Sequence, residues 1–204
     1  MTSPCNILIG IASGGTMRVE TVTSLIGAME VIKGHGVGVN LSIEIGGYVA
    51  HNRNALVDTA QRTGATHLMF IDNDMTFQPS AIQRLLDHDK DIVGANYNAR
   101  GVPGKPVVST VKLVNPETDP NKNKTYMSEF PAQLFKCYGL GTGFMLINME
   151  VFNHLTRPYF VAYEDPNGEH HTEDIEFCKR AGEAGIDVWC SPTIKVGHIG
   201  TYEY

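Results

Sequence analysis

The chain has 204 residues, of which 42% are hydrophobic and 19% are charged. This length and composition suit one globular domain with a substantial core, so we expect a single domain over residues 1–204. A net charge of -6 argues against non-specific binding of polyanions by the chain as a whole. No apolar run approaches the roughly 18 residues that a membrane-spanning helix needs, so no membrane span is expected.

The expected compartment is the cytoplasm. The first residues, Met1-Thr2-Ser3-Pro4, lack the basic start and apolar stretch of a signal peptide. The four cysteines lie far apart and form no Cys-x-x-Cys pair, so we expect them to be reduced rather than joined in a disulfide framework.

Strand and helix signals alternate through the first half of the chain. The apolar run over 6–12 is typical of a buried parallel strand, and a Gly-rich turn over 13–16 follows it. Apolar residues then recur at helical spacing from Val19 to Met29. Further strands are expected over 37–45, 67–71 and 91–95, and further helices over 52–62 and after Pro79. This alternation predicts an α/β fold with a mainly parallel central sheet and helices on both faces.

The second half of the chain is less regular. Strands are expected near 107–113, 135–138, 144–147 and 193–196. A short helix is expected over 149–155 and another over 173–184, with a loop over 159–171. No linker divides this half from the first.

The triplet Asp72-Asn73-Asp74 closes the strand 67–71. In an open parallel sheet, ligands bind at the carboxyl ends of the strands. Two carboxylates spaced i and i+2 can turn toward one hard cation where the pleat of a strand breaks, and Mg²⁺ or Mn²⁺ suits such oxygen ligands. An Asx turn that ends the strand is the alternative interpretation.

Further segments stand in order around this triplet. Arg53-Asn54 precedes it at a helix start, and three segments follow it: 139–147, which is rich in glycine, the acid pair Glu173-Asp174, and Gly197-His198-Ile199-Gly200. The ordered set spans nearly the whole chain and resembles the GT-A glycosyltransferases, especially the family-2-like branch with its small phage and bacterial members. The resemblance implies a GT-A (Rossmann-like) domain that moves a sugar from a nucleoside-diphosphate sugar, with a UDP-sugar favoured.

The donor is expected along the end of the first strand, the helix arginine and the glycine segment. Gly14 lets the backbone approach a nucleotide. The alternative is a plain turn without a role in binding. Arg53 has the shape to pair with a phosphate or stack on a base, unless it is a surface arginine. Gly141 and Gly143 permit close approach of a sugar, or mark a bulged strand start. The complete set expected at the donor is Ile11, Ser13, Gly14, Arg53, Asp72, Asn73, Gly141, Thr142 and Gly143.

The resemblance also assigns catalytic and metal-binding residues. Asp174, with Glu173 beside it, is expected to be the base that takes the proton of the acceptor hydroxyl. Acids in the first turn of a helix are also favoured by its dipole, which is the competing explanation. His198 is expected to join Asp72 and Asp74 around Mn²⁺ or Mg²⁺, which would offset the charge of the leaving diphosphate. A purely structural histidine is the alternative.

The acceptor is suggested by an uneven distribution of charge. Between Arg100 and Lys136, six lysine and arginine residues stand against three acids, within a chain that is acidic overall. Together with the resemblance to phage enzymes, this favours hydroxymethylated pyrimidines in DNA, and then the cytoplasm would be that of the host cell. A glycan or a protein hydroxyl is the alternative acceptor, and a solvated lysine-rich turn is the simpler interpretation of the charge.

Two other functions stay open at this point. Arg18 follows the Gly-rich turn 13–16, an arrangement that nucleotidyltransferases on a related fold also use. A non-catalytic module that binds nucleotide sugars or glycans is the second alternative.

Overall fold

The computed structural model describes residues 5–100, 105–108, 131–168 and 170–200. Within these residues, seven strands form one central sheet. In spatial order they are β2 (Gly38–Ile45), β1 (Asn6–Ser13), β3 (His67–Ile71), β7 (Phe144–Asn148), β5 (Ile92–Ala95), β10 (Val188–Ser191) and β6 (Phe135–Cys137). β7 and β6 run antiparallel to their neighbours, and the other five strands share one direction.

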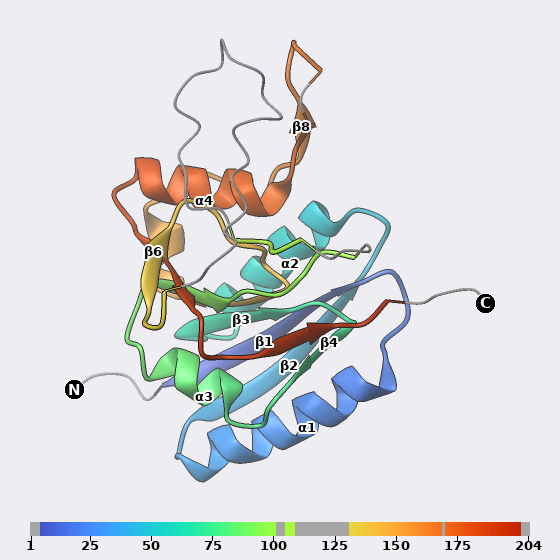
Figure 1. Cartoon of the computed structure of the whole chain (residues 1–204), viewed down its shortest axis with the longest axis vertical. Coiled ribbons are helices and arrows are strands. Elements are labelled where there is room, and N and C mark those ends of the chain that lie inside the picture. The colour runs from blue at the N-terminus through green and yellow to red at the C-terminus, as the bar shows by residue number, and fades with distance from the viewer. Residues whose placement is uncertain (1–4, 101–104, 109–130, 169, 201–204) are drawn as a thin grey trace.

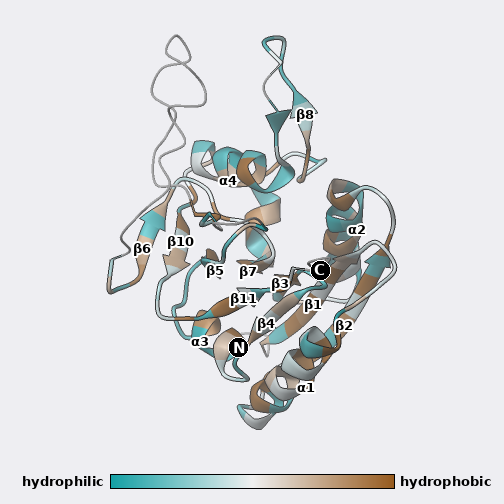
Figure 2. Cartoon of the chain, turned by 45° about the vertical axis from the view of Figure 1, so that its right-hand side comes forward, coloured by the Kyte–Doolittle hydropathy of each residue, from teal (hydrophilic) through white to brown (hydrophobic). Residues whose placement is uncertain are grey.

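Helices cover both faces of this sheet (Figure 1). Alternation along β1 explains why: Ile7, Ile9 and Ile11 belong to one buried cluster, and Leu8 belongs to the other. The first cluster is shared with α1 (Val19–Gly34) and α3 (Ala81–Leu86), and the second with α2 (Val49–Arg62) and α4 (Glu173–Glu183). Figure 2 shows the same contrast, with β1 largely hydrophobic and the β8 hairpin largely hydrophilic.

Two small two-stranded sheets complete the described architecture. β4 (Met75–Phe77) follows the acidic triplet and pairs antiparallel with β11 (Val196–His198), with His198 opposite Met75. β8 (Tyr163–Glu164) pairs with β9 (His170–His171) in a hairpin beside α4. The β4–β11 pair brings the C-terminal part of the chain to the edge of the sheet where β3 ends.

The predicted fold class is confirmed: the chain has an α/β fold with a mostly parallel central sheet flanked by helices. The strands expected over 6–12, 37–45, 67–71, 91–95, 135–138 and 144–147 are all present, as are helices over or close to the expected ranges. None of the helices in the described ranges combines the length and apolar character that crossing a membrane requires.

Several expectations for the second half of the chain were wrong. Val107 and Val108 lie in no strand, and the rest of the strand expected near 107–113 falls outside the described residues. The strand expected at 193–196 is replaced by β10 before it and β11 at its end. The loop expected over 159–171 carries the β8–β9 hairpin, and the helix expected over 149–155 is the 3-10 turn Met149–Asn153.

Candidate functional site

The triplet Asp72-Asn73-Asp74 is held at the carboxyl end of β3 by neighbouring elements. The Asp72 backbone N–H donates to Gly143 O over 3.0 Å. The Asn73 carbonyl accepts from the Arg18 N–H at the start of α1 over 2.9 Å. The Asp74 carbonyl accepts from Ile199 N–H over 2.9 Å, just beyond β11. Each residue of the triplet is therefore fixed by a different part of the fold.

Arg53 lies buried on α2 between two carboxylates. Its Nη2 is 3.0 Å from Asp72 Oδ1, and its Nη1 is 2.5 Å from Glu173 Oε1. Burial alone would lower the pKa of Arg53, but the carboxylates of Asp72, Glu173 and Asp174 outweigh it and raise that pKa. Arg53 is therefore no surface arginine, and it ties the end of β3 to the start of α4.

The two acids at the start of α4 occupy different environments. Glu173 is mostly buried against Arg53, and burial raises its pKa, with Asp174 and Asp72 adding to the shift while Arg53 opposes it. Asp174 accepts hydrogen bonds at Oδ1 only, from the Thr172 hydroxyl over 2.5 Å and the Ile175 N–H over 2.8 Å. Its Oδ2 has no hydrogen-bond partner among the described residues. One oxygen of Asp174 is thus fixed and the other is available.

Asp74 and His198 face each other across the β4–β11 pair. His198 Nε2 lies 3.3 Å from Asp74 Oδ2, and both side chains are largely buried. His198 Nδ1 lies 2.9 Å from the backbone carbonyl of Asn98, which can only accept, so Nδ1 carries a proton and donates it. Arg100 also reaches the same Asp74 oxygen, from a side chain that is 64% exposed. The buried carboxylate is therefore contacted from two sides.

The side chains of Asp72, Asp74 and His198 are of the chemical types that bind a divalent cation. Two carboxylates and one imidazole are suitable ligands, and a histidine whose other ring nitrogen is held by a carbonyl is the usual arrangement at a metal site. The structure brings Asp74 and His198 together, whereas Asp72 Oδ1 accepts a hydrogen bond from Arg53. Across the described ranges, no three His, Cys, Asp or Glu side chains are grouped closely enough to hold a metal ion as they stand. Asp72 would have to turn toward the other two.

Tyr97 was not singled out from the sequence, although it follows the end of β5 at the same edge of the sheet. Its hydroxyl accepts a hydrogen bond from the Gly143 N–H over 3.0 Å. A Cβ on Gly141 would lie 2.5 Å from that hydroxyl. A Cβ on Gly143 would lie 2.5 Å from the same hydroxyl and 2.7 Å from Asp72 Oδ2. Tyr97 and Asp72 therefore leave no room for a side chain at these two glycines. The neighbouring Thr142 is fully buried.

The residues expected at the nucleotide are only partly accessible. The Ile11 side chain is fully buried in the core that β1 shares with α1, so only its main chain is available there. The Ser13 hydroxyl donates to Thr16 O over 2.8 Å and accepts from Gly15 N–H over 3.1 Å, which closes the turn. A Cβ on Gly14 would meet nothing within 4 Å. Gly14 thus borders open space at the end of β1.

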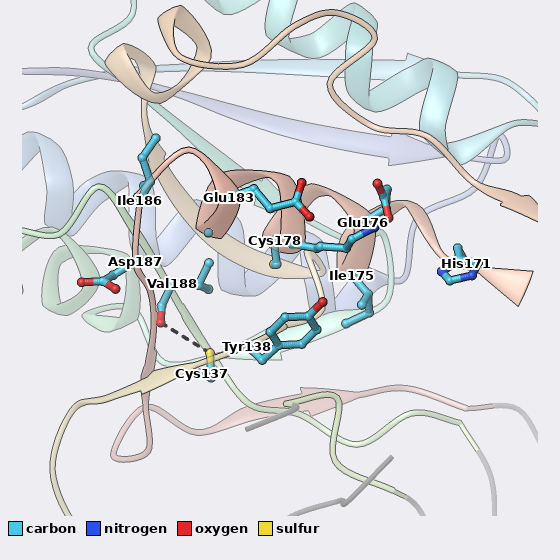
Figure 3. A pocket seen from close by; sticks show the side chains of 12 residues that line it. Cys137, Tyr138, His171, Ile175, Glu176, Cys178, Glu183, Ile186, Asp187 and Val188 are labelled. Atoms are coloured by element: carbon cyan, nitrogen blue, oxygen red, sulfur yellow. Dashed lines mark hydrogen bonds and ion pairs between the residues drawn. The ribbon is translucent and has the colours of Figure 1, made fainter. Parts of the chain in front are cut away.

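A separate cavity of about 400 Å³ lies against α4 (Figure 3). Its lining includes Cys137, Tyr138, Ile175 and Glu176, and none of the residues expected at the donor or the metal. Cys137 donates to the Val188 carbonyl over 3.7 Å, and burial raises the pKa of its thiol. The cavity is lined by residues of α4, the helix that also carries Glu173.

Comparison with known proteins supports the fold. No family model matches the chain, and no curated protein matches it. The solved structure of A197 from STIV is similar over 96% of this chain and 86% of that one, with a TM-score of 0.62 and 18% identity. That likeness supports the α/β fold and no more.

Two further solved structures overlap less well. One is a protein from Bacillus anthracis assigned as a glucose-1-phosphate thymidylyltransferase, in complex with a sucrose (TM-score 0.48, 12% identity, 97% of this chain and 91% of that one). The other is a glycosyltransferase involved in the glycosylation of the major capsid of PBCV-1 (TM-score 0.37, 12% identity, 76% and 70%). At these scores neither contributes to the functional argument.

Proposed function

We propose that this chain is a metal-dependent, inverting glycosyltransferase that uses a nucleoside-diphosphate sugar, with a UDP-sugar favoured. The observation that carries the proposal is the Asp74–His198 pair. Because His198 Nδ1 is held by the Asn98 carbonyl, Nε2 is the ring nitrogen that faces a buried oxygen of Asp74, 3.3 Å away. A cation between the two would satisfy both, and Asp72 lies two residues away on the same turn.

The side chains around this pair supply the remaining chemistry. In the proposed reaction, the acceptor oxygen attacks the anomeric carbon, the bond from that carbon to the diphosphate breaks, and Asp174 Oδ2 takes the hydroxyl proton. Asp174 suits this role because Oδ1 is already anchored by Thr172 and Ile175. A cation held by Asp72, Asp74 and His198 would offset the charge of the leaving diphosphate.

Glu173 and Arg53 serve as positioning residues in this proposal. Their ion pair fixes the start of α4, and with it Asp174, relative to the end of β3. Two buried polar atoms in the same region, Arg53 Nε and Thr142 Oγ1, have no hydrogen-bond partner in the described part of the chain. Buried polar atoms are nearly always satisfied, so unsatisfied ones here support a site that binds a ligand.

Product analysis tests the proposal directly. The full-length protein is incubated with Mn²⁺, a panel of nucleoside-diphosphate sugars and nucleoside triphosphates, and candidate hydroxyl acceptors. Release of nucleoside diphosphate, lost in Asp174→Asn, supports glycosyl transfer. Release of pyrophosphate from a triphosphate and a sugar phosphate supports a nucleotidyltransferase instead. Donor binding without turnover across the whole panel supports a non-catalytic binding module.

For the acceptor, we propose hydroxymethylated pyrimidines in DNA, with a glycan or protein hydroxyl as the alternative. The support is the excess of positive charge between positions 100 and 136. Most of these lysines lie outside the described residues, and Lys136 pairs with Asp187 over 2.6 Å. A nucleic-acid acceptor predicts steep inhibition by salt through counterion release. Transfer to modified DNA that ignores salt, or no transfer to it at all, would contradict this choice.

A further inference from the structure

Arg100 combines an exposed side chain with a buried partner. Its side chain is 64% exposed, whereas the Asp74 side chain that it reaches is 5% exposed. The guanidinium contacts Asp74 Oδ2, which is also the oxygen that faces His198 Nε2. A side chain that is mostly in solvent can leave this contact without disturbing the core, unlike Arg53, whose guanidinium is enclosed.

The position of Arg100 is set by the same backbone that orients His198. Asn98 makes an isolated bridge with Pro106, and the Ala99 N–H donates to Lys105 O over 2.7 Å. The Asn98 carbonyl holds His198 Nδ1, and Arg100 follows two residues later. The backbone that leads to Arg100 is therefore held beside the Asp74–His198 pair.

A guanidinium and a divalent cation compete at such an oxygen. A buried carboxylate needs a positive partner, because an unpaired charge away from water is costly. A cation seated between Asp74 and His198 would supply that charge and would stand beside the guanidinium, where like charges repel. The two partners of Asp74 therefore exclude one another, and the weaker binder is displaced.

We infer that Arg100 is the resident counter-ion of Asp74 and is displaced when a divalent cation binds. The inference rests on the proposed function, because it takes Asp74 and His198 to be cation ligands. Arg100 keeps the buried carboxylate paired while the protein is free of donor, and it lowers the affinity of the donor-free protein for the cation. Arg100 then limits cation binding without being a ligand.

The test is the affinity of the donor-free, full-length protein for Mn²⁺, followed by electron paramagnetic resonance of the free ion. Arg100→Gln removes the charge and keeps a side chain of similar reach. Arg100→Lys keeps the charge. Arg62→Gln, on the exposed end of α2 where Arg62 contacts only Thr59 in the described part of the chain, is the matched control for loss of one positive charge.

We expect Arg100→Gln to bind Mn²⁺ about tenfold more tightly than the wild type, an effect of the size that hydrogen bonds to charged groups reach. Arg100→Lys and Arg62→Gln should stay within about twofold of the wild type, because both leave a cation beside Asp74. Equal or weaker Mn²⁺ binding by Arg100→Gln would overturn the inference, as would an equal gain in Arg62→Gln.

Failure of this inference is distinguishable from failure of the proposed function. If the wild type and Arg100→Gln bind Mn²⁺ equally well and the protein still releases nucleoside diphosphate, the inference alone is overturned. Tighter Mn²⁺ binding in Arg100→Gln without any turnover of a donor supports the inference and contradicts the glycosyltransferase. The absence of Mn²⁺ binding in every variant, with or without UDP, overturns both the inference and the metal-dependent mechanism.

Discussion

Arg53 and Glu173 are 120 positions apart in the sequence, yet Arg53 Nη1 lies 2.5 Å from Glu173 Oε1 in a largely buried ion pair. The other end of the same guanidinium binds Asp72 over 3.0 Å. One arginine on α2 thus joins the strand that carries the acidic triplet to the helix that carries Asp174.

Replacing Arg53 should destabilise the fold strongly. Arg53→Met leaves the carboxylates of Asp72 and Glu173 without their cation, and removing one partner of a buried pair costs about 3–5 kcal/mol. Urea unfolding measures the loss, with Arg62→Met on the exposed end of the same helix as the control. The control should change the free energy of unfolding by less than about 0.5 kcal/mol. Equal effects of the two substitutions would mean that the ion pairs of Arg53 contribute little.

Glu173 should make stability depend on pH. Burial raises the pKa of Glu173 above its ordinary value of 4.5, so the folded protein binds more protons at this group than the unfolded chain does. The free energy of unfolding then falls as the pH rises from about the ordinary value through the raised pKa. Glu173→Gln removes this dependence, so its stability relative to the wild type should improve with rising pH. Urea titrations at several pH values test this, and a difference that stays constant or shifts the other way would contradict it.

Two glycines form a matched pair that separates packing from ligand binding. Gly143→Ala places a Cβ 2.5 Å from the Tyr97 hydroxyl and 2.7 Å from Asp72 Oδ2, and such overpacking costs about 1–3 kcal/mol. Gly14→Ala meets no atom within 4 Å, so its stability should stay near that of the wild type.

The second measurement on this pair is donor affinity. If the nucleotide backbone approaches the turn after β1, Gly14→Ala should weaken donor binding while leaving thermal unfolding unchanged. Unchanged affinity in Gly14→Ala would remove Gly14 from the donor site without affecting the assignment of Asp74.

The first half of the fold follows from the sequence because its elements carry clear local patterns. The strands over 6–12 and 67–71 are nearly continuous apolar runs, and the helix beginning at Val19 has apolar residues at helical spacing. β4 and β10 are only three and four residues long, so they carry no such signal. Their pairing is decided by contacts with β11, β5 and β6 rather than by local pattern.

The positions of the acids could be predicted from the sequence, whereas their contacts could not. Asp72 and Asp74 follow a strand and Glu173 begins a helix, as expected, and the roles assigned to them stay predictions. The burial of Arg53 between two of them could not be predicted, because it depends on how α2 and α4 pack. Arg100 contributed only to a charge count, since its contact with Asp74 spans 26 positions. Tyr97 follows β5 at the carboxyl edge, and that placement was the one signal available.

Asp174 is the residue on which the proposed transfer depends. Asp174→Asn keeps an oxygen for Thr172 and Ile175 but takes no proton, so the fold should be retained. We expect donor affinity to persist while transfer falls by roughly 10²–10⁴, the usual contribution of a positioned general base. Steady-state rates with saturating donor measure this fall. Near-normal transfer would assign Asp174 to capping of α4 and direct attention to Glu173.

The most direct test of the central claim is calorimetric titration of UDP and a panel of UDP-sugars into the wild type and Asp74→Asn, each with and without Mn²⁺. Asp74→Asn keeps the size of the side chain and removes the charge that would hold the cation, so the diphosphate loses its link to the protein. We predict Mn²⁺-dependent binding in the wild type that Asp74→Asn abolishes, while its urea unfolding shows that it remains folded. Donor binding that is equal with and without Mn²⁺, or equal in the two proteins, would contradict a metal-dependent donor site at Asp74.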